Sequence, residues 1–245
     1  MPTSTPLAHD AFHARAKSQP NHVAIELDHE WLSYGQLEAL ANTLASQLVH
    51  AHGVAPGDCV AVLMHRCLEV PIALLAAMQI GASILPLEGR LAQLDTLLAG
   101  SHVLLASEPY RKPIRAMGIS MPVEFVDVQT LASKPEPFEP SFAPREASEC
   151  AYILPDSFER VSHAQLLAAS FDDPVGGLDR FHAHLWPTLA RGHIVDLDHK
   201  QTPIASVREI SCVRPTSHSE SHCVAVLESA PPLMFMLPSV DLNPL

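Results

Sequence analysis

The chain has 245 residues, of which 47% are hydrophobic, so it can bury a core as one large domain or as one and a half small ones. Its 27 acidic residues outnumber its 15 basic residues and give a formal net charge of −12. An acidic surface repels phosphate backbones and anionic lipids, so we expect neither a nucleic-acid partner nor a membrane partner.

The N-terminal segment and the cysteines suggest a compartment. Residues 1–6 lack the basic patch and apolar run of a secretory signal. The longest apolar stretch, 70–84, is interrupted by Pro71, Gln79 and Gly81 and is too short to cross a bilayer. The five cysteines include no Cys-x-x-Cys pair, which is typical of free thiols in a reducing compartment. We therefore expect a cytoplasmic protein.

Helices and short strands are predicted along the first part of the chain. Residues 8–18 favour a helix, and two strand-like runs follow at 23–27 and 31–33. Leucines recur at helical spacing at positions 37, 40, 44 and 48. This pattern predicts a helix that starts after Ser33 as its N-cap, continues to His50 and is ended by Gly53.

The next elements form a strand–helix–strand unit. The continuous apolar run 59–64 is typical of a buried parallel strand, a helix is predicted over 69–79, and another strand over 83–87. Further helical segments are expected at 91–98 and 112–117, and strands at 102–106 and 124–128. Residues 8–132 are therefore expected to form an open, mainly parallel α/β layered sheet.

The rest of the chain is divided by a proline-rich stretch. Residues 133–149 contain four prolines and are expected to be a linker or an extended surface crossing. After it, strands are predicted at 151–154 and 193–198, and helices at 162–170 and 181–191. The pattern weakens after residue 200, so 201–245 is left unassigned.

Two sequence stretches resemble core motifs of the adenylation domains of nonribosomal peptide synthetases, which belong to the adenylate-forming superfamily. Residues 31–42 (WLSYGQLEALAN) are similar to the first motif. Residues 57–88 are similar to the segment that ends in Lys-x-Gly-x-x-x-x-Pro-Leu-Asp, with Gln79 in place of the Lys and Glu88 in place of the Asp. The match runs in order over residues 9–106. The resemblance implies an incomplete N-terminal subdomain of these enzymes.

The resemblance resumes at residues 150–154 (CAYIL). In the family this strand leads into a Ser/Thr/Gly-rich loop, closed by Pro-Lys-Gly, whose N–H groups and lysine grip ATP phosphates. This chain has residues 155–160 (PDSFER) instead, with no glycine, with the carboxylates of Asp156 and Glu159, and with Arg160 as the one basic side chain. The resemblance therefore implies that the chain does not activate acids with ATP.

Other departures point the same way. Residues 161–166 (VSHAQL) resemble a Val-x-His-x-x-Leu segment, so His163 matches a histidine of the family. Residues 171–175 (FDDPV) resemble Phe-Asp-x-Ser-Val, whose Asp holds the substrate's α-amino group, and this makes Asp172 a candidate substrate-binding residue. Far fewer residues separate these two segments than in the family. Residues 150–200 are interpreted as a remnant of a second sheet layer, and the later family motifs have no match.

Three groups of residues were weighed as sites. His163 and Asp172 could form a repurposed acid–base pair, although Asp172 also suits a turn before Pro174. His182 and His184 have a recurrent metal-ligand spacing, but a helix over these positions would splay the rings apart. A further pair, His218 and His222, lies beside Cys223 in a segment that does not favour a helix. We expect no metal and no cofactor.

Three functions are compatible with this sequence. The first is an adenylation-domain-like pseudoenzyme or accessory module of a secondary-metabolite pathway, with a pathway enzyme or carrier protein as partner. The second is a small ATP-independent cyclase, isomerase or hydrolase that uses the old acyl pocket. The third is a chain completed by a separately encoded second half. Because the family's front half packs against strands that find no match here, we also expect a homodimer or a bound partner.

Overall fold

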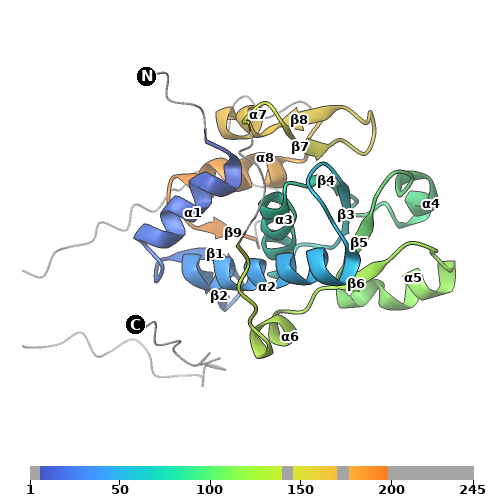
Figure 1. Ribbon diagram of the computed structural model, residues 1–245, viewed down its shortest axis with the longest axis horizontal. Coiled ribbons are helices and arrows are strands. Elements are labelled where there is room, and N and C mark those ends of the chain that lie inside the picture. Colours follow the sequence, from blue (N-terminus) through green and yellow to red (C-terminus); the bar gives the residue numbers. More distant parts are fainter. Residues whose placement is uncertain (1–5, 140–145, 170–176, 198–245) are drawn as a thin grey trace, which may run out of the picture. The chain divides into compact units, whose positions relative to one another are not determined.

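The computed structural model describes residues 6–139, 146–169 and 177–197. A six-stranded sheet lies at its centre, in the order β6-β5-β3-β4-β7-β8 (Figure 1). Its strands are β3 (Cys59–Leu63), β4 (Ser83–Pro86), β5 (Val103–Ala106), β6 (Val123–Phe125), β7 (Cys150–Ile153) and β8 (Arg160–Ser162). Neighbouring strands are parallel except β7 and β8, which form an antiparallel hairpin.

Strand β3 shows why this sheet needs helices on both faces. Val60 and Val62 pack into one core with α2 (Tyr34–His52) and α3 (Glu69–Ile80). Ala61 and Leu63 pack into a second core with α4 (Leu94–Leu97) and α5 (Arg111–Met117). Because successive side chains of a strand point to opposite faces, a strand that is apolar throughout must be covered twice. The predicted open, mainly parallel α/β layered sheet is confirmed.

A smaller sheet has the order β2-β1-β9. The antiparallel pair β1 (Val23–Leu27) and β2 (Glu30–Ser33) is joined by β9 (Val195–Asp196), which runs parallel to β1. Helix α1 (Ala8–Ser18) packs against α8 (Arg180–Ala190), and α7 (His163–Ala168) also contacts both. Residues 150–197 are thus shared between the two sheets: β7 and β8 extend the large sheet, and β9 extends the small one.

The helix boundaries follow local chemistry. Ser33 begins α2 in a capping box with Gln36, and Gly53 and Gly81 end α2 and α3 with φ of 70° and 90°. In this left-handed region glycine costs least. The predicted strand 124–128 is wrong at its end, because Asp127 accepts a hydrogen bond from the Thr130 amide and starts helix α6 (Val128–Ser133). The predicted helix 91–98 is divided into η1 (Leu91–Gln93) and α4, and η2 (Glu108–Tyr110) precedes α5.

None of the helices in the described parts of the chain combines the length and the apolar character needed to cross a bilayer.

Tyr34 connects the start of α2 to the end of α8 through hydrogen bonds. Its side chain is fully buried, and its hydroxyl lies 2.9 Å from the carbonyl oxygen of His193 and 3.0 Å from that of Leu189. Both carbonyls belong to the end of α8 and the loop after it, where helical partners run out. The tyrosine of the first core motif therefore has a structural role here.

Replacing Tyr34 with Phe should lower the free energy of unfolding by about 1–3 kcal/mol, because the His193 carbonyl loses the hydroxyl that it accepts from. Urea denaturation of the two proteins measures this difference. Tyr110→Phe, which removes a hydroxyl from a half-buried ring, is the matched control and should change stability by less than about 0.5 kcal/mol. Equal effects of the two substitutions would contradict the assignment.

Candidate functional site

Open α/β sheets bind ligands beyond the carboxyl ends of their strands, at the point where neighbouring connections leave in opposite directions. Here that point lies between β3 and β5, because the chain leaves β3 towards β4 and leaves β5 towards β6. Ser107 follows β5, and its amide donates to the Leu63 carbonyl at 3.4 Å. The Ser107 hydroxyl lies 3.3 Å from Nδ1 of His65, which follows β3. Direct protein contacts therefore bridge the two strand ends.

Arginines follow the carboxyl ends of three neighbouring strands, and each is paired with a carboxylate of the same chain. The pairs are Arg66–Asp179 at 3.8 Å after β3, Arg90–Asp156 at 2.7 Å after β4, and Arg111–Glu108 at 2.7 Å after β5. Arginine is the side chain best suited to bind phosphate or carboxylate groups. An edge with the composition of an anion site is therefore neutralised internally at all three positions.

The crevice next to β3 and β4 is nearly filled by side chains. The hollow that remains measures about 10 Å³, which is about the space that one water molecule requires. The Arg66 guanidinium lies 5.5 Å from the centre of the Phe181 ring, and both side chains line the hollow. Burial raises the pKa of Glu88, which also lines it, while the nearby Arg66 acts in the opposite direction. The described residues leave no room here for an acyl or aryl group.

The β7–β8 hairpin stands where the resemblance places a phosphate-binding loop. The Leu154 amide donates to the Glu159 carbonyl at 2.9 Å, and the Phe158 amide donates to the Leu154 carbonyl at 2.8 Å. Two amides at the turn are therefore used to close it. Phe158 has a φ of 57°, a left-handed conformation that costs a bulky residue on the order of 1 kcal/mol. The turn is tight and has none of the glycines that an anion-cradling loop uses.

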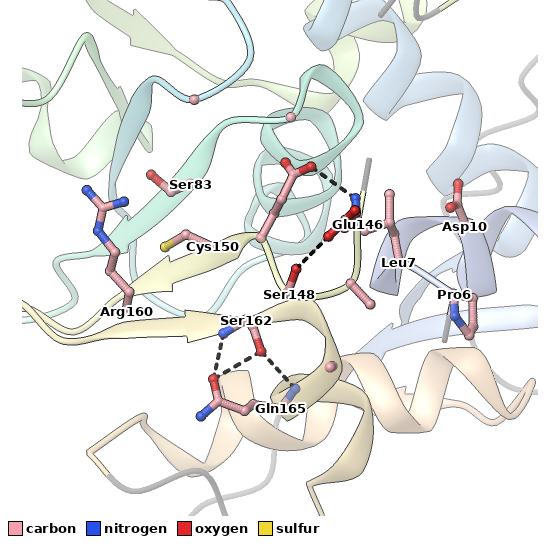
Figure 2. Close-up of a pocket in the computed structure, with 15 residues that line it drawn as sticks. Pro6, Leu7, Asp10, Ser83, Glu146, Ser148, Cys150, Arg160, Ser162 and Gln165 are labelled. Carbon is pink, nitrogen blue, oxygen red and sulfur yellow. Dashed lines mark hydrogen bonds between the residues drawn. The ribbon is translucent and has the colours of Figure 1, made fainter. Parts of the chain in front are cut away.

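A larger and open cleft, of about 1130 Å³, lies at the opposite, amino ends of the strands (Figure 2). Arg160 points to this side, beside Ser83 and Cys150, which begin β4 and β7. The one basic side chain of residues 155–160 is therefore directed away from the arginine-lined edge. Polar and apolar groups both line the cleft, and Glu146, Ser148 and Glu149 form part of its wall through mutual hydrogen bonds.

Among the candidate site residues that the structure describes, His163 lines neither cleft, whereas His182 lines the small hollow. His163 is 1% exposed, and its Nδ1 accepts a hydrogen bond from the Ala8 amide at 3.4 Å. The ring packs edge-on against His9, at 5.6 Å between centroids. Asp172, predicted as its partner and as a substrate-binding residue, lies outside the described residues. The acid–base pair of His163 and Asp172 therefore stays a prediction. The His163 side chain begins α7 and is buried against α1.

The two histidines considered as an alternative metal pair, His182 and His184, lie on α8. His182 is 4% exposed, whereas His184 is only partly buried, so the helix separates their environments as expected from its geometry. Within residues 6–139, 146–169 and 177–197 no group of three metal-ligating side chains occurs. His218, His222 and Cys223 lie outside these ranges.

His182 belongs instead to a buried polar chain. Nε1 of Trp186 donates to the Tyr152 hydroxyl at 3.0 Å, and this hydroxyl lies 3.4 Å from Nδ1 of His182. Since the tyrosine oxygen already accepts from Trp186, the Tyr152 hydroxyl is assigned as the donor to Nδ1 of His182. Burial lowers the pKa of His182 to about 4, and the imidazole is neutral at pH 7. These hydrogen bonds join β7 to α8.

Arg66, Arg90 and Asp179 were not predicted from the sequence as residues of a site. Each arginine comes three or four residues after an apolar strand, a position that marks the carboxyl edge of a parallel sheet. Asp179 precedes the predicted helix as an N-cap, and its Oδ1 accepts from the Phe181 amide at 2.8 Å. These signals were present in the sequence, but only the strand order shows that the residues share one edge.

The strand order and the helices on both faces define an open α/β fold. Residues 12–98 match the family of AMP-binding enzymes. The chain is therefore adenylation-domain-like and is similar to the N-terminal part of such enzymes, as its core motifs indicated.

Individual relatives agree. Adenylate-forming reductase 03009 of Coprinopsis cinerea is 36% identical over 124 residues, which are 49% of this chain and 12% of the reductase. Nonribosomal peptide synthetase astA of Aspergillus oryzae is 32% identical over 114 residues, or 45% of this chain and 8% of the synthetase. The chain therefore matches only a small part of these relatives' length. The structure of VinN with L-aspartate is similar in fold, with a TM-score of 0.67 at 18% identity, over 80% of this chain and 63% of VinN.

The buried His182 should make stability depend on pH. Its pKa is 6.5 when unperturbed and about 4 in the folded chain, so the unfolded chain binds this proton more tightly. The free energy of unfolding should therefore fall as the pH falls from 6.5 towards about 4, by at most roughly 3 kcal/mol from this group. Urea denaturation at several pH values measures the slope.

His182→Leu should flatten that slope, because it removes the group that takes up the proton on unfolding. His29→Gln changes an exposed histidine in the β1–β2 turn and is the control that should leave the slope as it is. If His182→Leu retained the slope of the natural chain, the assignment would be wrong.

Proposed function

We propose that this nonribosomal-peptide-synthetase-like chain does not activate acids with ATP and acts as an accessory or interaction module of a secondary-metabolite pathway. The observation that carries the proposal is the tight β7–β8 turn, where two amides bond back to the hairpin and no glycine or lysine is present. Binding of a polyphosphate requires several N–H groups and a cation directed at one point.

Electrostatics at the same edge support the proposal. Asp156 and Glu159 lie on the turn, and a carboxylate about 4 Å from a phosphate charge costs about 4 kcal/mol at an effective dielectric constant near 20. Arg66, Arg90 and Arg111 offer no net positive charge, because each is paired with a carboxylate. An incoming triphosphate would therefore meet repulsion that no unpaired arginine of this set offsets.

The purified chain should show no ATP–pyrophosphate exchange with amino acids or aryl acids, and no heat of ATP binding in calorimetry. An adenylating enzyme assayed in parallel confirms that the exchange assay works. The calorimetric measurement is independent of the acid chosen, so a missing substrate cannot explain a negative result. Exchange with any acid, or ATP binding in the presence of Mg²⁺, would overturn the proposal.

An accessory role also requires a surface for a partner, and we propose a second copy of this chain or a pathway enzyme or carrier protein. Trp31 on β2 and Ile194 beside β9 are large apolar side chains exposed on the small sheet. Exposed aromatic and aliphatic groups of this kind are typical of contact surfaces.

Light scattering over a range of concentrations should therefore show a dimer, or a complex when a pathway protein is added. Trp31→Lys should shift the mass towards the monomer. Phe158→Lys changes an exposed aromatic on the hairpin and is the matched control. A monomer at all concentrations, with or without the candidate partner, would count against this surface.

The alternative of a small ATP-independent enzyme depended on His163 and Asp172. His163 is buried against α1 and lines neither of the two clefts described above. The described residues therefore offer no observation that favours this alternative.

A further inference from the structure

The pair formed by Arg90 and Asp156 has the geometry of a bound ligand. Nη2 of Arg90 donates to Oδ2 of Asp156 at 2.7 Å, and Nη1 donates to Oδ1. Two parallel bonds of this kind are how a guanidinium recognises a carboxylate or a phosphate. The two residues are 66 positions apart and come from different strand connections, so the bonds are not a consequence of local sequence.

Arg90 differs from the other two arginines of the edge. Arg66 lies over the Phe181 ring, and Arg111 lies 3.9 Å from the centre of the Phe125 ring. Arg111 also pairs with Glu108 only three positions away on the same segment. Ring contacts or local pairing hold these two guanidinium groups in place, whereas Arg90 is held by the carboxylate of the hairpin.

The hairpin carboxylate is a weak occupant. The Asp156 side chain is 70% exposed and that of Arg90 is 31% exposed, and pairs this accessible contribute about 0.2–1 kcal/mol. The same turn contains Phe158 in its unfavourable left-handed conformation. An oxyanion with two or more negative charges would interact more strongly with Arg90 than one carboxylate does.

We propose that Arg90 is an oxyanion-binding group at the carboxyl edge of the sheet and that Asp156 occupies it as an internal, displaceable ligand. The ligand class is a small oxyanion with at least two charges, of the phosphate or the carboxylate type. The inference rests on the proposed function, because it treats the same edge as an anion site closed by the chain's own carboxylates.

Calorimetric titration at low ionic strength tests the proposal, with inorganic pyrophosphate in one arm and malonate in the other to distinguish the two types. Asp156→Asn keeps the size of the side chain and removes its charge, and should bind at least one probe about tenfold more tightly than the natural chain. Adding Arg90→Gln to this variant should abolish the gain. Asp156→Ala repeats the test if the amide of Asn still occupies the arginine.

Glu159→Gln is the matched control. It removes the same charge from the same hairpin, but Arg90 is paired with Asp156, so this variant should gain much less affinity for the probes than the Asp156 variants do. The inference is overturned if the Asp156 variants bind neither probe more tightly than Glu159→Gln, or if the gain survives Arg90→Gln. ATP–pyrophosphate exchange by the natural chain would overturn the proposed function instead, so the two failures are distinguishable.

Discussion

The burial of strand β3 on both faces is the constraint on which the rest of this structure depends. Its side chains alternate between two cores, with Val60 and Val62 in one and Ala61 and Leu63 in the other. Such a strand is stable only when parallel neighbours pair with it and helices cover both sides. Crossovers then bring the carboxyl ends of β3, β4 and β5 to one edge. Arg66, Arg90 and Arg111 and their carboxylate partners lie there.

At that edge the arginines are balanced by carboxylates of the same chain. Three arginines that could bind anions are each paired with a carboxylate, and the nearby crevice is reduced to a hollow of about 10 Å³. Fold does not imply function, and the similarity to VinN at 18% identity describes the fold alone. The functional argument therefore rests on the hairpin and its partners.

Local sequence signals predicted most of the elements. The Ser33 capping box and the left-handed glycines at 53 and 81 depend on interactions between near neighbours in the chain. The central strands were predicted from their continuous apolar runs. The wrong end of the predicted strand 124–128 also had a local cause, because Asp127 caps helix α6 and does not continue the strand. Short elements such as η1 and α4 were located, but their helix type was not.

The sequence by itself determined the class of the fold and the absence of a glycine-rich loop at residues 155–160. Periodicity, helix caps and composition can be recognised from residues that are close together in the sequence. Only the tertiary structure decided which candidate side chains lie close together and where they point. It buried His163 beside Ala8, turned Arg160 towards the amino ends, and joined Arg90 to Asp156 across 66 positions. Such contacts depend on strand order and on the direction of side chains, which no local pattern specifies. The segment that replaces the glycine-rich loop is therefore a closed hairpin whose Asp156 pairs with Arg90.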